Sequence, residues 1–124
     1  MKRGERVLFG EIVKMVDGKI LYQQNEKEFT NACATDMLSE LLAVGKEKAI
    51  LLTGLCTPQM INTADIVGIG AVIVVRGKNI PFATIKRAQE LDIPLAVTSL
   101  TMFSTCGRLF CNGLKDVNED GKKW

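Results

Sequence analysis

Histidine is absent from this sequence of 124 residues, and other catalytic signatures are absent with it. Without histidine the chain cannot build a Ser-His-Asp or Cys-His nucleophile system or a zinc site with histidine ligands. No stretch matches the phosphate loop G-x-x-x-x-G-K-S/T, and Gly68 and Gly70 precede an apolar run instead of linking a strand to a helix. We therefore expect a binding protein with no catalytic residues, no cofactor and no enzymatic activity.

Neither sign of charge dominates, because 16 basic residues stand against 14 acidic ones, which leaves a net charge of +2. Binding to a phosphate backbone needs a pronounced basic surface, so we expect no nucleic-acid partner. Long hydrophobic runs are also missing, since the apolar stretch at residues 66–75 is far shorter than the roughly 20 residues that span a bilayer. With a charged N-terminus that lacks a signal-peptide pattern, the sequence indicates a cytoplasmic protein without a membrane partner.

The four cysteines do not form a disulfide framework. They lie inside apolar or helical patterns, so we expect free thiols. Cys106 and Cys111 are five positions apart on a predicted helix and point in different directions, so we expect no metal site there. The thiols are interpreted as small buried side chains, and a redox role for Cys56 or Cys33 is the least favoured hypothesis.

What the sequence does contain is enough apolar residues, 47%, to fill one core. We predict a single domain at residues 1–114, followed by a polar tail at residues 115–124. The first part of the domain is predicted to hold a helix at residues 7–16, two strands at residues 19–23 and 29–34 that pair with each other in antiparallel fashion, and a helix that Asp36 caps and Gly45 ends.

The rest of the chain repeats one unit three times: an apolar strand, a polar loop and an amphipathic helix. The strands are expected at residues 49–53, 71–75 and 94–98, and the last helix is expected to turn Phe103, Cys106, Gly107 and Phe110 inward. Strands that are apolar at every position are typical of a parallel sheet covered on both faces. The predicted fold is therefore a three-layer α/β domain with a parallel sheet core and a short antiparallel strand pair near the N-terminus.

Polar loops follow each of the three apolar strands. In open α/β sheets, ligands gather at the carboxyl ends of the parallel strands, where helix N-termini direct amide groups outward. Hydroxyl groups, glycines and two cations in such loops suit a phosphate or a carboxylate, although serine and threonine are also ordinary helix caps. The candidate ligand-binding residues are Thr53, Gly54, Cys56, Thr57, Arg76, Gly77, Lys78, Thr98, Ser99 and Thr101.

The order of segments resembles that of the DRTGG domain, a small module related to the N-terminal domain of the HPr kinase/phosphorylase. The resemblance covers about residues 8 to 114. It rests on Ala34-Thr35-Asp36-Met37-Leu38-Ser39, on Pro58-Gln59-Met60-Ile61-Asn62, on the spacing from Val75-Arg76-Gly77-Lys78 to Pro81, and on Ile93-Pro94-Leu95 with Gly107-Arg108-Leu109. Two family features differ here. The signature Asp-Arg-Thr-Gly-Gly is replaced by Phe29-Thr30-Asn31-Ala32-Cys33-Ala34, and a frequent His-Pro pair by Thr57-Pro58.

The resemblance implies a regulatory domain, usually a homodimer, without established catalytic activity of its own. Together with the loops, it leads to a hypothesis: a regulatory module that binds a small anionic ligand, such as a nucleotide or a phosphorylated metabolite. The alternative is a protein–protein interaction adaptor that docks on a redox or metabolic enzyme partner.

Overall fold

A computed structural model of the protein describes residues 4–117. Strands and helices alternate along most of this range. In chain order the elements are β1 (Val7–Leu8), α1 (Phe9–Met15), β2 (Lys19–Tyr22), β3 (Glu28–Phe29), β4 (Asn31–Ala34), α2 (Leu38–Val44), β5 (Ile50–Thr53), α3 (Pro58–Val67), β6 (Ala71–Val74), α4 (Phe82–Leu91), β7 (Leu95–Val97), α5 (Met102–Cys111) and β8 (Lys115–Asp116).

The main sheet has six strands in the order β2-β7-β6-β5-β4-β8. Strands β8, β4, β5, β6 and β7 are parallel, and β2 is antiparallel to β7 at one edge. Every residue of β5 and β6 is buried, as expected for central strands that are covered on both faces. The prediction of a parallel α/β sheet is confirmed.

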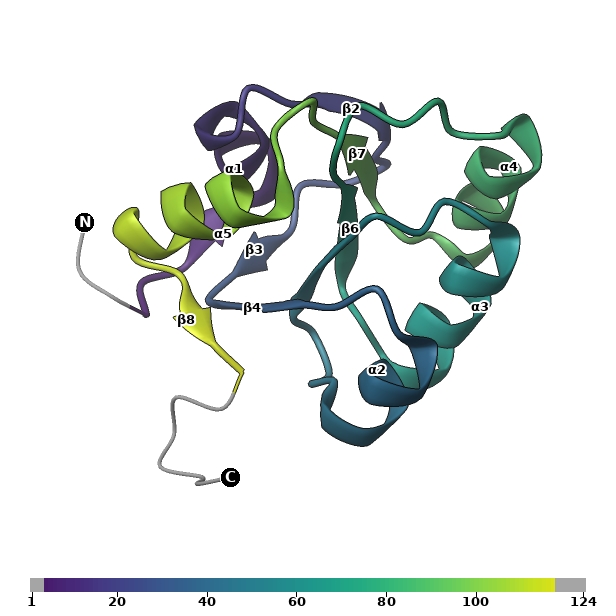
Figure 1. Ribbon diagram of the computed structural model, residues 1–124, viewed down its shortest axis with the longest axis horizontal. Coiled ribbons are helices and arrows are strands. Elements are labelled where there is room, and N and C mark those ends of the chain that lie inside the picture. The colour runs from purple at the N-terminus through teal and green to yellow at the C-terminus, as the bar shows by residue number, and fades with distance from the viewer. Residues whose placement is uncertain (1–3, 118–124) are drawn as a thin grey trace.

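Helices cover both faces of this sheet, which gives the three predicted layers (Figure 1). Helices α2, α3 and α4 lie on one face, and α1 and α5 lie on the other. The chain moves from β4 to β7 in one direction across the sheet, then returns through α5 to β8 beside β4. Because parallel crossovers share one hand, this reversal places α5 on the face opposite to α2, α3 and α4.

The short antiparallel pair near the N-terminus exists, but its strands are not the predicted ones. The predicted pairing of residues 19–23 with residues 29–34 is wrong, because β2 pairs with β7 and β4 pairs with β5, at different places in the sheet. The antiparallel pair is β1 with β3, where Val7 faces Phe29. Phe29 packs against Phe9 in the core, with ring centroids 5.9 Å apart.

Three local predictions need correction as well. The first two residues of the predicted helix at 7–16 form β1. Phe103, which was expected to face inward, is 89% exposed, because α5 instead turns Thr105 and Leu109 toward the sheet. Lys115 and Asp116, at the start of the predicted tail, form β8 beside β4. The remainder of that tail, residues 118–124, lies outside the described residues.

Candidate anion-binding site

The carboxyl ends of the parallel strands meet at one edge of the sheet, and the loops that follow β6 and β7 diverge there. The loop after β6 leads to α4 on one face, whereas the loop after β7 leads to α5 on the other face. Such a divergence is the usual position of a ligand in open α/β sheets. The three loops selected from the sequence follow neighbouring parallel strands and so lie at the same edge of the sheet.

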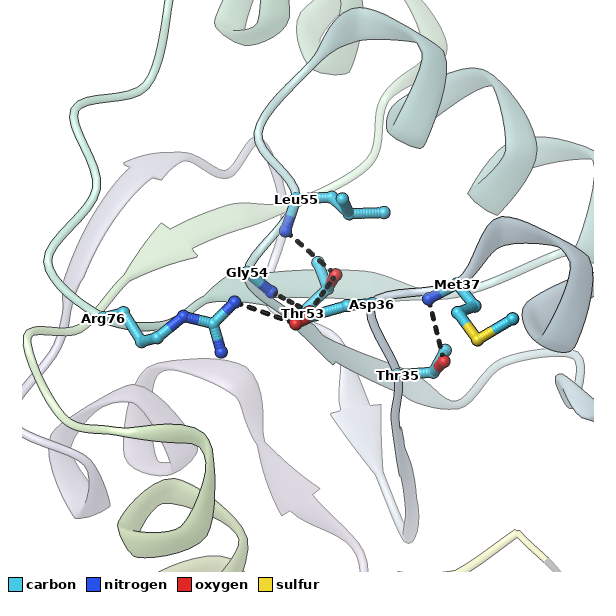
Figure 2. Close-up of polar contacts among 7 residues, drawn as sticks. All are labelled: Thr35, Asp36, Met37, Thr53, Gly54, Leu55 and Arg76. Atoms are coloured by element: carbon cyan, nitrogen blue, oxygen red, sulfur yellow. Dashed lines mark hydrogen bonds and ion pairs between the residues drawn. The ribbon is translucent and has the colours of Figure 1, made fainter.

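Asp36 is the centre of the contacts at these strand ends (Figure 2). The amide of Gly54 donates a hydrogen bond of 2.6 Å to Asp36 Oδ1, and the Thr53 hydroxyl donates a second one of 3.3 Å to the same oxygen. Arg76 Nη2 lies 2.8 Å from Asp36 Oδ2. We call these four residues, Asp36, Thr53, Gly54 and Arg76, the strand-end cluster.

Asp36 was predicted to cap α2, and that prediction is wrong. The N-cap of α2 is Met37, which makes no side-chain cap hydrogen bond, and the Asp36 carboxylate turns toward the loop after β5 instead of toward the helix. The amide of Gly54, and then the guanidinium of Arg76, lower the pKa of Asp36 below its usual value, against the opposing effect of partial burial. Asp36 thus holds a carboxylate charge at the strand ends, and it was missing from the residues selected by sequence.

Gly54 makes room for the Arg76 side chain. A Cβ atom at position 54 would overlap the Arg76 guanidinium, whose Nη2 lies 1.6 Å from the position of that atom. A side chain at this position would therefore push Arg76 away from Asp36. Glycine is needed at position 54 because the Arg76 guanidinium lies so close to the backbone there. It is not needed for its backbone conformation, since the φ of Gly54 lies outside the left-handed region.

The turn after β6 holds two successive residues with positive φ, Arg76 at 71° and Gly77 at 64°. For arginine this left-handed conformation carries a cost of about 1 to 2 kcal/mol. Hydrogen bonds from the Arg76 amide to the Leu100 carbonyl (2.8 Å) and from the Gly77 amide to the Thr98 carbonyl (2.9 Å) maintain it. The two neighbouring loops are thereby joined, and the Arg76 side chain is directed back to the end of β5.

Three of the predicted hydroxyl residues have structural partners. Thr57 caps α3 by accepting a hydrogen bond from the Met60 amide, and Thr101 caps α5 by accepting one from the Ser104 amide. The buried hydroxyl of Thr98 donates to the Val16 carbonyl at 2.6 Å. These residues fix the loops and the helix starts.

The remaining candidates lie around the cluster. Cys56 is half-buried, and its backbone carbonyl accepts a hydrogen bond from Thr84. Lys78 and Ser99 are exposed, and Ser99 packs beside Gly77. Of the predicted residues, Thr53, Gly54 and Arg76 are thus brought together through Asp36, and Lys78 adds a second cation in the same loop as Arg76.

A pocket of about 380 Å³ lies elsewhere, along the edge of the sheet at β4 and β8. We call it the edge pocket. Consecutive residues of β4, Ala32, Cys33 and Ala34, all line it, although their side chains alternate between faces, so it must run along the edge of β4 beyond the short pairing with β8. Its other walls include Leu109 from α5 and Val44 from α2. The pocket is mostly apolar, and none of the predicted ligand-binding residues line it.

Burial is the main cause that raises the pKa of the Cys33 thiol in this pocket, to about 11, with smaller contributions from the carboxylates of Asp116 and Glu40. All four cysteines are free, as predicted. Within residues 4–117, no group of three or more potential metal ligands gathers. Over the same residues, none of the helices has the length and apolar character needed to cross a membrane.

No family model and no curated protein matches the sequence, whereas solved structures with a similar fold exist. Its fold is similar to the crystal structure of the CBS and DRTGG domains of the regulatory region of Clostridium perfringens pyrophosphatase, complexed with the activator diadenosine tetraphosphate. The TM-score is 0.72, with 17% identity over 86% of this chain, and this chain spans about half, 47%, of that one. The likeness in fold agrees with the three-layer α/β architecture described above.

Proposed function

We propose that this chain is a non-catalytic regulatory module that binds a small anionic ligand, a nucleotide or a phosphorylated metabolite, beside β4, β5 and β6. One observation carries the proposal: the Gly54 amide and the Arg76 guanidinium converge on a single carboxylate at the strand ends. A backbone amide and an arginine fork aimed at one point are the groups that bind phosphate in many proteins.

The conformation of Arg76 supports this function. Arg76, a residue other than glycine, is held with φ at 71° by hydrogen bonds between its turn and the loop after β7, and such conformations gather at ligand sites. Lys78, two residues further along, is exposed and supplies a second positive charge for a phosphate.

The similar fold in the pyrophosphatase regulatory region supports a regulatory role, since its crystal structure holds a nucleotide activator. The proposal for this chain extends only to an anionic ligand of that class. The homodimer and the cytoplasmic location expected from the sequence stay predictions. Light scattering during size-exclusion chromatography tests the first of these two.

Calorimetric titration with inorganic phosphate, AMP, ATP and diadenosine tetraphosphate tests the proposed function. We expect at least one of these anions to bind the chain and Arg76→Gln to weaken that binding by tenfold or more, about 1.4 kcal/mol. Arg87→Gln is the matched control, because the Arg87 side chain is 40% exposed and the Arg76 side chain 39%, and Arg87 pairs with Asn62 and Glu90. Equal binding by the two variants, or no binding of any anion, would reject the proposal.

A second candidate function is that of a protein–protein interaction adaptor for an enzyme complex. Large exposed apolar side chains favour it: Phe103 on α5 is 89% exposed, Phe82 on α4 76% and Ile66 on α3 75%. Single apolar side chains are common on protein surfaces, so the adaptor needs a direct test. The adaptor function is favoured if an enzyme co-purifies with the unmodified chain and if Phe103→Ser or Phe82→Ser abolishes this co-purification. An unchanged set of partners in these variants would count against the adaptor function.

A further inference from the structure

The carboxylate of Asp36 occupies the position that the proposed function gives to the ligand. Three donors of the strand-end cluster bind Asp36: the Gly54 amide at 2.6 Å, the Thr53 hydroxyl at 3.3 Å and Arg76 Nη2 at 2.8 Å. An anion that uses these donors must therefore replace Asp36. The Asp36 side chain is 43% exposed, so solvent already reaches it and it has space to leave.

We propose that Asp36 is an internal competitor that selects the class of ligand: a phosphate group displaces it from Gly54 and Arg76, whereas a simple carboxylate does not. This inference rests on the proposed function. A tethered carboxylate acts at an effective concentration on the order of millimolar, so a free carboxylate of equal strength gains no advantage over it. A phosphate group carries a charge of about −1.5 to −2 and three acceptor oxygens. It can accept from Gly54, Thr53 and the two-pronged guanidinium at once, with Lys78 in the same loop to offset its second charge.

Displacement of Asp36 also changes what holds the start of α2. This helix has seven residues, its N-cap Met37 makes no side-chain cap, and Leu41 is its buried residue. Three hydrogen bonds fix the chain before this helix. The Thr35 amide donates to the Leu52 carbonyl, the Met37 amide donates to the Thr35 hydroxyl, and the Gly54 amide in the loop after β5 donates to Asp36. Without the Asp36 contacts, the first turn of α2 should open more often, because little apolar burial holds it.

The decisive comparison is between the unmodified chain and Asp36→Asn. The asparagine oxygen still accepts from Gly54, but its amide group cannot pair with Arg76, so the guanidinium is released. Titration with inorganic phosphate and with ATP should give about fivefold tighter binding to Asp36→Asn, the equivalent of losing one exposed ion pair of about 1 kcal/mol. Acetate should bind neither protein, and Arg87→Gln should match the unmodified chain.

Amide hydrogen exchange gives a second readout. Saturating phosphate or ATP should speed exchange at Met37 and Leu41 in the unmodified chain, whereas Asp36→Ala, which also removes the contacts with Gly54 and Thr53, should exchange rapidly there without any ligand. A purely structural Asp36 would produce fast exchange in the variant but no response to phosphate in the unmodified chain.

The outcomes separate the two proposals. If phosphate or ATP binds the unmodified chain through Arg76, but Asp36→Asn binds no tighter and α2 does not respond, the competitor role is wrong and the proposed function stands. If acetate binds as well as phosphate, the selection of ligand class is wrong. If neither protein binds any of the anions, both proposals fail.

Discussion

The strand-end cluster and the edge pocket are two sites of opposite character in one small domain. The pocket is a real hollow of about 380 Å³ with mostly apolar walls, but it offers few groups that could orient a ligand. The cluster is not hollow, because Asp36 fills it, yet it concentrates directed donors on one point. Changes at the pocket should therefore act mainly on the stability of the fold, and changes at the cluster mainly on binding.

The largest expected effect is that of Leu109→Ala in the wall of the edge pocket. Leu109 is 1% exposed and packs in the core formed by α1, α5 and the sheet. Truncation of a buried leucine costs about 2 to 5 kcal/mol, because apolar burial is lost and a cavity is left. Urea denaturation monitored by circular dichroism measures this loss.

Phe103→Ala on the same helix is the control, since Phe103 is 89% exposed and should change the free energy of unfolding by no more than about 0.5 kcal/mol. A similar loss from both variants would mean that Phe103 is packed as well as Leu109, and a larger loss from Phe103→Ala would mean that α5 packs through the opposite face. Anion binding by folded Leu109→Ala should be unchanged, which keeps the two sites distinct.

Gly54→Ala should have the next largest effect, because it acts both on the stability of the fold and on anion binding. The added Cβ would overlap Arg76, so the guanidinium must leave Asp36, at an expected cost of about 1 to 3 kcal/mol and with loss of anion binding. Gly107→Ala is the matched control. Apart from the adjoining residues and backbone of α5 itself, no atom lies within 4 Å of its new Cβ, and alanine inside a helix should stabilise by about 0.5 to 1 kcal/mol.

Combining Gly54→Ala with Arg76→Gly tests the cause of this effect. If the overlap with Arg76 is responsible, the double variant should recover much of the stability that Gly54→Ala loses, which a double-mutant cycle measures. Additive losses would show that another neighbour of Gly54 causes the damage.

Sequence reasoning found the cluster only in part, and the missing part is its centre. Gly54 and Arg76 could be selected because they follow apolar strands. Asp36 could not, since it precedes an apolar helical stripe and has the position of a helix cap. To recognise Asp36 as part of the cluster, one must know that β4 pairs in parallel with β5. A hydrophobic pattern indicates that a strand is buried but does not indicate which strand it pairs with.

The helix α5 illustrates a related limit. Apolar residues cover more than one side of it, so its pattern allowed either Phe103 or Leu109 to face the sheet. The buried face includes Thr105, whose hydroxyl donates to the Thr101 carbonyl and is therefore buried without penalty, and a hydrophobic pattern does not anticipate a buried threonine. By contrast, the central strands were predictable, because residues that are apolar at every position can be buried on both faces.

The contribution of Asp36 to the free energy of unfolding should depend on pH, and this effect should be smaller than that of Gly54→Ala. The pKa of Asp36 is lowered in the folded protein from its ordinary value of 3.8. A carboxyl group with a depressed pKa stabilises the fold above its unfolded pKa, and this contribution disappears as the pH falls through the folded value. Because the side chain is 43% exposed, solvent screening limits the contribution to about 1 kcal/mol or less.

Thermal unfolding of the unmodified chain and of Asp36→Asn should therefore differ at pH 7, with the unmodified chain more stable, and the two should converge as the pH is lowered below 4. Asp17→Asn is a useful comparison, since Asp17 also pairs with an arginine, Arg108, but lies outside the cluster. A difference between the chain and Asp36→Asn that persists unchanged in acid would mean that the charge of Asp36 is not what stabilises the loop.

The smallest expected effect is on the chemical reactivity of the Cys33 thiol in the edge pocket, and it does not involve the free energy of unfolding. Burial raises the pKa of Cys33 to about 11, so at pH 8 only about one thiol in a thousand is ionised. Since the thiolate is the reactive form, labelling of Cys33 by iodoacetamide should be much slower than that of exposed Cys111, and it should rise about tenfold per pH unit. Mass spectrometry of the labelled peptides measures both rates. Rapid labelling of Cys33 at pH 8 would show that the pocket opens to water. Such a result would favour the hypothesis of a redox role for Cys33, which the burial of this thiol argues against.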